Sequence, residues 1–155
     1  MRRVTVVLSV AAVVLMAAGV VAQVKPSLAG EWKMVGDLVG PEGDLTITQN
    51  ATTMTLEGGD QTPAPVKVTY KLDGSVSKNM MTGRGGGAPT EQVSKAMWAA
   101  NKLVVTTTTG AGEEKRTFSM EGGNLVVETS APAHAGRAPN VTKVTFKRIE
   151  RGHGG

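Results

Sequence analysis

Side chains suited to catalysis or metal binding are few in this sequence. The only two histidines, His134 and His153, stand in segments rich in glycine, alanine and proline, where we expect loops. A metal site needs three or four ligands that converge from rigid elements. No serine stands in the Gly-x-Ser-x-Gly turn that presents a nucleophile. We therefore expect no metal site, no cofactor and no nucleophilic catalysis.

The acidic residues stand mostly at or near expected turns. Five of them are Asp37, Asp44, Glu57, Asp60 and Asp73. Carboxylates in turns accept hydrogen bonds from nearby backbone amides. We expect these side chains to cap turns and to keep the surface soluble.

The glycine-rich segment Gly83–Gly87 could suggest a phosphate-binding loop. The Walker pattern requires a Lys-Ser/Thr pair on a helix that follows the glycines, whereas Arg84 stands among them. The segment therefore predicts a flexible rim loop, and the protein is predicted not to be an enzyme.

Residues 1–22 have the layout of a secretory signal peptide. Two arginines precede the apolar run Val4–Val21, and Val20 and Ala22 place small residues three and one positions before a cut at Gln23. The apolar run is about long enough to span a bilayer, so the alternative is an uncleaved anchor. We expect a secreted or periplasmic protein whose only membrane contact is this signal.

The remaining composition excludes several classes of function. The chain has no cysteine, which excludes disulfides, thiolate metal sites and iron–sulfur clusters. Without Arg2 and Arg3, 15 basic residues remain against 13 acidic ones. No basic run is interleaved with aromatic residues, so we expect no nucleic-acid partner. We expect a monomer.

The chain after the signal has the alternating pattern of β-strands. In Val66–Leu72 every second residue is apolar, and Leu45–Thr48 and Thr53–Leu56 alternate in the same way. Asp73-Gly74 and Gly122-Gly123 supply the positive φ angles of tight hairpin turns. Short links of this kind predict an antiparallel up-and-down meander of about ten strands, beginning near Glu31.

A few segments depart from this pattern. Gly83–Pro89 and Ser130–Asn140 are predicted loops, and residues 151–155 a disordered tail. Val93 and Met97 stand at helical spacing, so the first half of Glu91–Ala100 is predicted as a possible helical turn and its second half as a strand.

One apolar and one polar face on every strand require a single enclosed interior. An all-β, antiparallel up-and-down β-barrel of about 8–10 strands meets that need and removes unpaired edges; a two-sheet sandwich is the alternative. Residues 23–150 are predicted to form this one domain.

The first strand and the last carry a resemblance to a known group. Gly30-Glu31-Trp32 resembles the Gly-x-Trp opening of the lipocalins and fatty-acid-binding proteins, the calycin group. In that group the Trp plugs the closed end of the barrel and an Arg of the last strand packs over it. Here Arg148 shares a face with Val144 and Phe146, and an indole ring offers it a cation–π contact. The resemblance thus implies barrel closure by Trp32 and Arg148.

The middle of the chain resembles small exported lipocalin-like domains. The resemblance rests on the hairpin Tyr70–Gly74, on Trp98 and on the strand Lys102–Thr106. Two family features are missing: the Thr-Asp-Tyr type motif of lipocalins, and the helix-rich segment that follows the first strand of fatty-acid-binding proteins.

The predicted interior is rich in methionine, which adapts its shape to different partners. A barrel lined in this way could hold a small hydrophobic ligand, and the alternative is a packed barrel that serves as an envelope structural or interaction domain. The residues predicted to line a ligand are Met34, Met54, Leu56, Val68, Tyr70, Phe118 and Met120.

Overall fold

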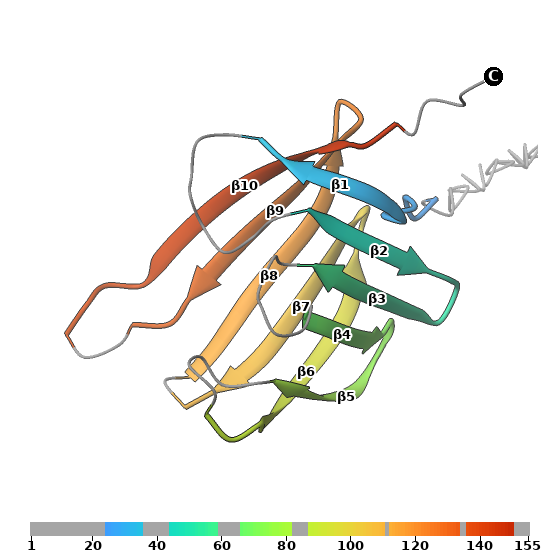
Figure 1. Ribbon diagram of the computed structural model, residues 1–155. Coiled ribbons are helices and arrows are strands. Elements are labelled where there is room, and N and C mark those ends of the chain that lie inside the picture. Colours follow the sequence, from blue (N-terminus) through green and yellow to red (C-terminus); the bar gives the residue numbers. More distant parts are fainter. Residues whose placement is uncertain are drawn as a thin grey trace, which may run out of the picture.

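The computed structural model describes residues 24–35, 44–58, 66–81, 87–110, 112–133 and 136–150, and these residues form ten strands and no helix. The strands follow one another along the chain as Figure 1 shows. Their bounds are β1 Gly30–Met34, β2 Leu45–Gln49, β3 Thr53–Gly58, β4 Val66–Lys71, β5 Asp73–Met81, β6 Thr90–Ala99, β7 Lys102–Thr109, β8 Gly112–Glu121, β9 Asn124–Ala131 and β10 Asn140–Arg148.

The predicted signal peptide 1–22, the predicted tail 151–155 and most of the predicted loop Gly83–Pro89 lie outside the described residues. Within the described ranges, no helix has the length and apolar character needed to cross a bilayer.

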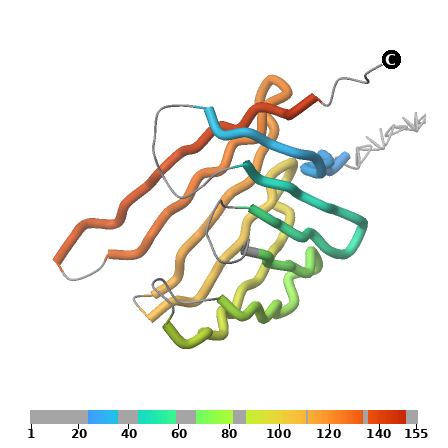
Figure 2. Tube along the Cα trace, viewed as in Figure 1, coloured from blue at the N-terminus to red at the C-terminus, as the bar shows by residue number. Residues whose placement is uncertain are grey.

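The ten strands form one antiparallel sheet in the order β4-β3-β2-β1-β10-β9-β8-β7-β6-β5. Consecutive strands are neighbours except β4 and β5, which form the two ends of the sheet. The first strand pairs with the last: Trp32 lies opposite Arg148, and Met34 opposite Phe146. Figures 1 and 2 show the strands curving around a common interior. The prediction of an up-and-down barrel is confirmed, and the sandwich alternative is wrong.

The two ends of the sheet, β4 and β5, meet through side chains. Asn79 Oδ1 accepts a hydrogen bond from the Thr69 backbone N–H at 2.9 Å, and its Nδ2 donates to the Thr69 carbonyl at 3.0 Å. Ser77 Oγ accepts from the Lys71 N–H at 2.8 Å. The Asn79 amide therefore makes the pair of bonds that a facing strand residue would make. We call these contacts of Ser77 and Asn79 the β4–β5 seam.

The hydrophobic core lies inside the barrel. Its members come from almost every strand, which is what strict alternation on a closed sheet produces. Fully or almost fully buried are Leu28, Trp32, Ile47, Met54, Leu56, Val68, Tyr70, Leu72, Ala96, Leu103, Val105, Phe118, Leu125 and Phe146.

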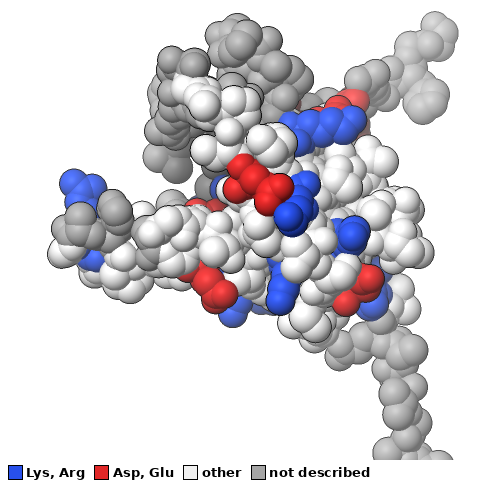
Figure 3. All heavy atoms as spheres, turned by 90° about the horizontal axis from the view of Figure 1, so that it is seen from below, with Lys and Arg blue, Asp and Glu red and all other residues white. Residues whose placement is uncertain are grey.

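The outer face carries charges of both signs. Lys67 bonds Glu57 at 2.6 Å and Lys78 bonds Glu91 at 3.1 Å, each pair joining neighbouring strands. On the face shown in Figure 3, basic and acidic side chains stand beside one another. Exposed pairs of this kind are worth at most about 1 kcal/mol each, so the core sustains the fold.

The structure corrects the prediction for Glu91–Ala100. This segment lies within the continuous strand β6, where Ser94 and Ala96 are buried and Met97 is 57% exposed. Val93 pairs with β5 on one side and β7 on the other. A helical turn would break both ladders, so the helical turn predicted from the spacing of Val93 and Met97 is wrong.

The predicted loop Ser130–Asn140 is shorter than expected. Ala131 pairs with Asn140, so the two strands continue further toward each other than the alanine, proline and glycine content indicates. Tertiary pairing here overrides the weak local strand propensity.

The seam makes a prediction for hydrogen exchange. Replacing Asn79 by Ala should speed exchange of the Thr69 amide and lower the free energy of unfolding by about 1 kcal/mol, because two hydrogen bonds are lost. Ser77→Ala should instead speed exchange of the Lys71 amide, so each variant is the control for the other. Unchanged exchange at both amides would show that the side chains do not hold the seam.

Candidate functional site

Trp32 and Arg148 form the first part of the candidate site. The Trp32 side chain is 0% exposed and its Nε1–H donates to the Leu28 carbonyl at 3.0 Å. The Arg148 Cζ lies 4.4 Å from the centre of the indole ring, and its Nη1 donates to the Ala29 carbonyl at 3.0 Å. The backbone before β1, the indole and the guanidinium thus form one closed cluster.

Arg148 has the parity of the inward-facing Phe146, but it does not enter the core. Arg148 is exposed, and its guanidinium covers the buried ring from the solvent side. No desolvation of the charge is involved, so a cation–π contact of about 0.5–1 kcal/mol is the appropriate scale.

Gly30 belongs to the same cluster. It has a φ of +150°, and a Cβ at this position would collide with the Arg148 guanidinium. The glycine of the Gly-x-Trp pattern is therefore favoured by its φ of +150°, which L side chains rarely adopt, and by the arginine of the last strand that lies against the backbone there. This contact joins two residues 118 positions apart and could not be seen from the sequence.

The seven predicted lining residues all belong to the hydrophobic cluster inside the barrel. Met34 and Met120 are partly buried against it. The other five, which have at most 6% of their surface exposed, are Met54, Leu56, Val68, Tyr70 and Phe118. They come from β1, β3, β4 and β8, so the alternation placed them correctly on the inner face. Their role as ligand contacts stays a prediction.

The sequence analysis missed a polar region on the inner face of β5–β8. Ser94 and Thr107 are 1% and 5% exposed, and their hydroxyl oxygens lie 2.8 Å apart. The alternation of the strand could have predicted this. Thr107 stands two and four residues after the inward-facing Val105 and Leu103, so its side chain must face inward as well. Hydroxyls that bond each other can lie inside a barrel without an unsatisfied group.

An ion pair lies on the same inner wall. Arg116 Nε and Glu114 Oε1 are 2.9 Å apart. Arg116 pairs with Val105 and Glu114 with Thr107, and both partners are buried. Residues directly opposite in a ladder share a face, so both charges face the interior. Their side chains remain 40% and 24% exposed, which means that solvent reaches this half of the barrel.

Tyr70 faces this ion pair from the opposite wall. Burial raises the pKa of its phenol above the ordinary value, the positive charge of Arg116 acts to lower it and the negative charge of Glu114 to raise it. Both charges act on the phenol, so the phenol and the two charges share one interior.

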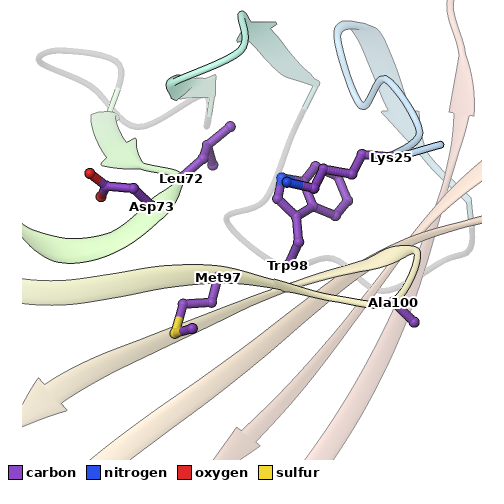
Figure 4. A pocket seen from close by; sticks show the side chains of 6 residues that line it. All are labelled: Lys25, Leu72, Asp73, Met97, Trp98 and Ala100. Atoms are coloured by element: carbon purple, nitrogen blue, oxygen red, sulfur yellow. The ribbon is translucent and has the colours of Figure 1, made fainter. Parts of the chain in front are cut away.

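A pocket of about 390 Å³ lies at the barrel end where the chain enters β1. Figure 4 shows its lining side chains, which come from the segment before β1, from the β4–β5 turn with the start of β5, and from the end of β6 with the turn that follows it. An adjoining pocket of about 310 Å³ shares Lys25, Leu72 and Trp98 with it. None of the seven predicted lining residues lines either pocket.

Asp73, which lines the larger pocket, has a structural task. It accepts hydrogen bonds from the Ser75 N–H at 2.9 Å and the Ser75 hydroxyl at 2.5 Å, and these bonds hold the pKa of its carboxyl below the ordinary value. This confirms the prediction of turn capping at Asp73.

Metal ligands do not gather in the part of the chain that the structure describes, where no three His, Asp or Glu side chains converge. His134 and His153 lie outside the described residues.

Comparisons with known proteins were informative at the level of structure. No protein-family model matches the chain, and no curated protein matches it. Several solved structures do match. One is the fluorescent protein UnaG, which matches with a TM-score of 0.56 and 19% identity; the match covers 79% of this chain and 97% of UnaG. The chain has the fold of the fatty-acid-binding proteins.

Two further structures support this assignment. The zebrafish ileal bile acid-binding protein, solved with cholic acid, has a TM-score of 0.57 and 18% identity, covering 78% of this chain and 98% of its own. The fatty-acid-binding protein of Manduca sexta has a TM-score of 0.53 and 15% identity, covering 78% of this chain and 99% of its own. The calycin resemblance is confirmed as a resemblance of fold.

The Gly30 cluster makes a prediction for stability. Gly30→Ala should lower the free energy of unfolding by about 1–3 kcal/mol, because the φ of +150° strains an L residue and the new Cβ displaces the Arg148 guanidinium. In an Arg148→Ala background the loss should shrink by at least about 0.5 kcal/mol. Gly110→Ala is the matched control, since a Cβ there meets nothing within 4 Å. Equal losses in both backgrounds, measured by urea unfolding, would contradict the contact.

The position of Tyr70 makes a prediction for alkaline titration. It is the only tyrosine in the chain, so the tyrosinate absorbance band reports it alone. The midpoint should lie above 10.0 in the folded protein and return to about 10 in denaturant. Because the folded pKa is raised, stability present below pH 10 should be lost as the pH rises toward that pKa, and Tyr70→Phe should abolish this loss. A folded midpoint at or below 10 would contradict the burial of Tyr70.

Proposed function

We propose that this protein is an exported binding barrel that holds a small hydrophobic ligand in the half of its interior away from Trp32. One observation carries the proposal: most inward-facing side chains in the half around Trp32 are buried, whereas several in the other half are partly exposed. The partly exposed inward positions include Met34, Met81, Gln92, Thr109 and Thr129. A barrel filled only by its own side chains would bury both halves alike.

The inner wall of this half offers two kinds of surface. Leu56 and Val68, opposite each other on β3 and β4, are apolar. The strands β6–β8 contribute the hydroxyls and the ion pair. The buried aromatic layer around Trp32 then serves as a floor. A ligand with an apolar body and a polar group fits such a wall, because the few polar groups would fix its orientation.

The comparisons support this proposal. The zebrafish neighbour is a bile acid-binding protein solved with cholic acid, and the Manduca sexta neighbour is named for fatty acids. Neither is named as an enzyme, and we propose a carrier role without catalysis. The signal-like residues 1–22 support a secreted or periplasmic location.

The second candidate is a packed envelope structural or interaction domain. It is favoured by the nearly complete burial of Met54, Tyr70 and Phe118, which leaves these predicted lining residues little free surface. In this case the rim loops would meet a partner and the interior would serve only stability.

A filled-interior variant distinguishes the two candidates. The neutral apolar probe N-phenyl-1-naphthylamine should bind the protein with enhanced fluorescence. Thr129→Trp should weaken binding at least tenfold, because Thr129 faces inward opposite Arg116 and an indole there occupies the ligand space. Glu128→Trp places the same indole on the outer face, where Glu128 is exposed, and should bind as the parent does.

Native mass spectrometry of the protein from its own cells completes the test. A reproducible bound small molecule, lost in Thr129→Trp and kept in Glu128→Trp, is the expected result. A ligand-free protein that also fails to bind the probe would support the packed domain instead.

A further inference from the structure

We propose that this barrel prefers uncharged ligands with a hydrogen-bonding group over organic anions, because Glu114 already neutralises the inward-facing Arg116. This inference rests on the proposed function and names the class of ligand that the interior accepts.

Glu114 and Arg116 both face the interior of the barrel. Glu114 and Arg116 stand two residues apart on β8, so their side chains leave the strand on the same side. Their ladder partners Thr107 and Val105 are 5% and 0% exposed, which identifies that side as the interior. The Nε–Oε1 distance of 2.9 Å is that of a charge-assisted hydrogen bond.

The inner face of β5–β9 carries no net charge. Among the inward positions of the described strands β5–β9, Glu114 and Arg116 are the only charged side chains. Their polar neighbours Ser94, Thr107, Gln92 and Thr129 are uncharged. Positive and negative charge therefore cancel locally, and a ligand anion gains little net attraction.

An anionic ligand group bound near Arg116 would be repelled by Glu114. A ligand carboxylate or sulfonate near the guanidinium would also lie near Glu114, since the two groups are in contact. Like charges repel more strongly in a partly desolvated interior than in water. A hydroxyl, amide or ester oxygen can accept from the free guanidinium N–H groups without that repulsion, and the Glu114 carboxylate can accept from a ligand donor.

A matched pair of probes tests the inference. N-phenyl-1-naphthylamine is neutral, and 8-anilino-1-naphthalenesulfonate carries a sulfonate on the same ring system. The parent protein should bind the neutral probe at least tenfold more tightly. Glu114→Gln leaves Arg116 without its counter-charge, and should raise affinity for the sulfonate relative to affinity for the neutral probe at least tenfold.

Two variants control the test. Glu113→Gln removes the same charge from the adjacent residue, which is exposed and faces outward, and should change neither affinity. Arg116→Gln leaves Glu114 alone on the wall, and should weaken sulfonate binding further; it keeps the proposal testable if Glu114→Gln fails to fold. Thermal unfolding of each variant establishes that it is folded.

The outcomes separate the inference from the proposed function. Equal affinity for the two probes in the parent, or no gain of sulfonate binding in Glu114→Gln, would overturn the preference for uncharged ligands and leave the binding barrel standing. Binding of neither probe to any folded variant would overturn both.

Discussion

The pairing of the first strand with the last is the constraint on which the rest of this structure depends. Without the β1–β10 ladder the strands would form two separate sheets, β1–β4 and β5–β10, each with its apolar face open to solvent. The ladder sets Trp32 opposite Arg148, and Gly30 leaves room for the guanidinium. The cation–π contact contributes about 0.5–1 kcal/mol, whereas burial of a side chain as large as Trp32 contributes several times more. Burial of the indole therefore dominates, and Arg148 completes its cover.

The closed sheet divides the interior into two chemically different halves. Around Trp32 most inward side chains are apolar and buried, so this half supplies most of the stability. In the other half, several inward positions of β5–β8 carry hydroxyls, amides and the Glu114–Arg116 pair, which contribute little to a hydrophobic core. Polar side chains on an inner face reduce stability compared with apolar ones. The proposed ligand recognition is a reason for their presence there.

The seam between β4 and β5 shows how the barrel closes where the backbone ladder ends. Asn79 and Ser77 extend across the gap and satisfy backbone groups of Thr69 and Lys71. A seam held by side chains has fewer hydrogen bonds per residue than a ladder. We expect the first local opening of the barrel there, because local unfolding starts where cooperative contacts are sparsest.

The sequence by itself determined the strand class, the hairpin turns, the up-and-down order and the inner-face positions of the predicted lining residues. Period-two alternation and turn glycines are local signals, so a single sequence carries them. It did not determine that Arg148 is exposed, that β6 is a strand throughout, or that Glu114 and Arg116 face inward beside Thr107. Those features depend on register between strands, and register is set by contacts between residues far apart in the chain. Only the closed tertiary structure decided which polar side chains share the interior with the apolar ones.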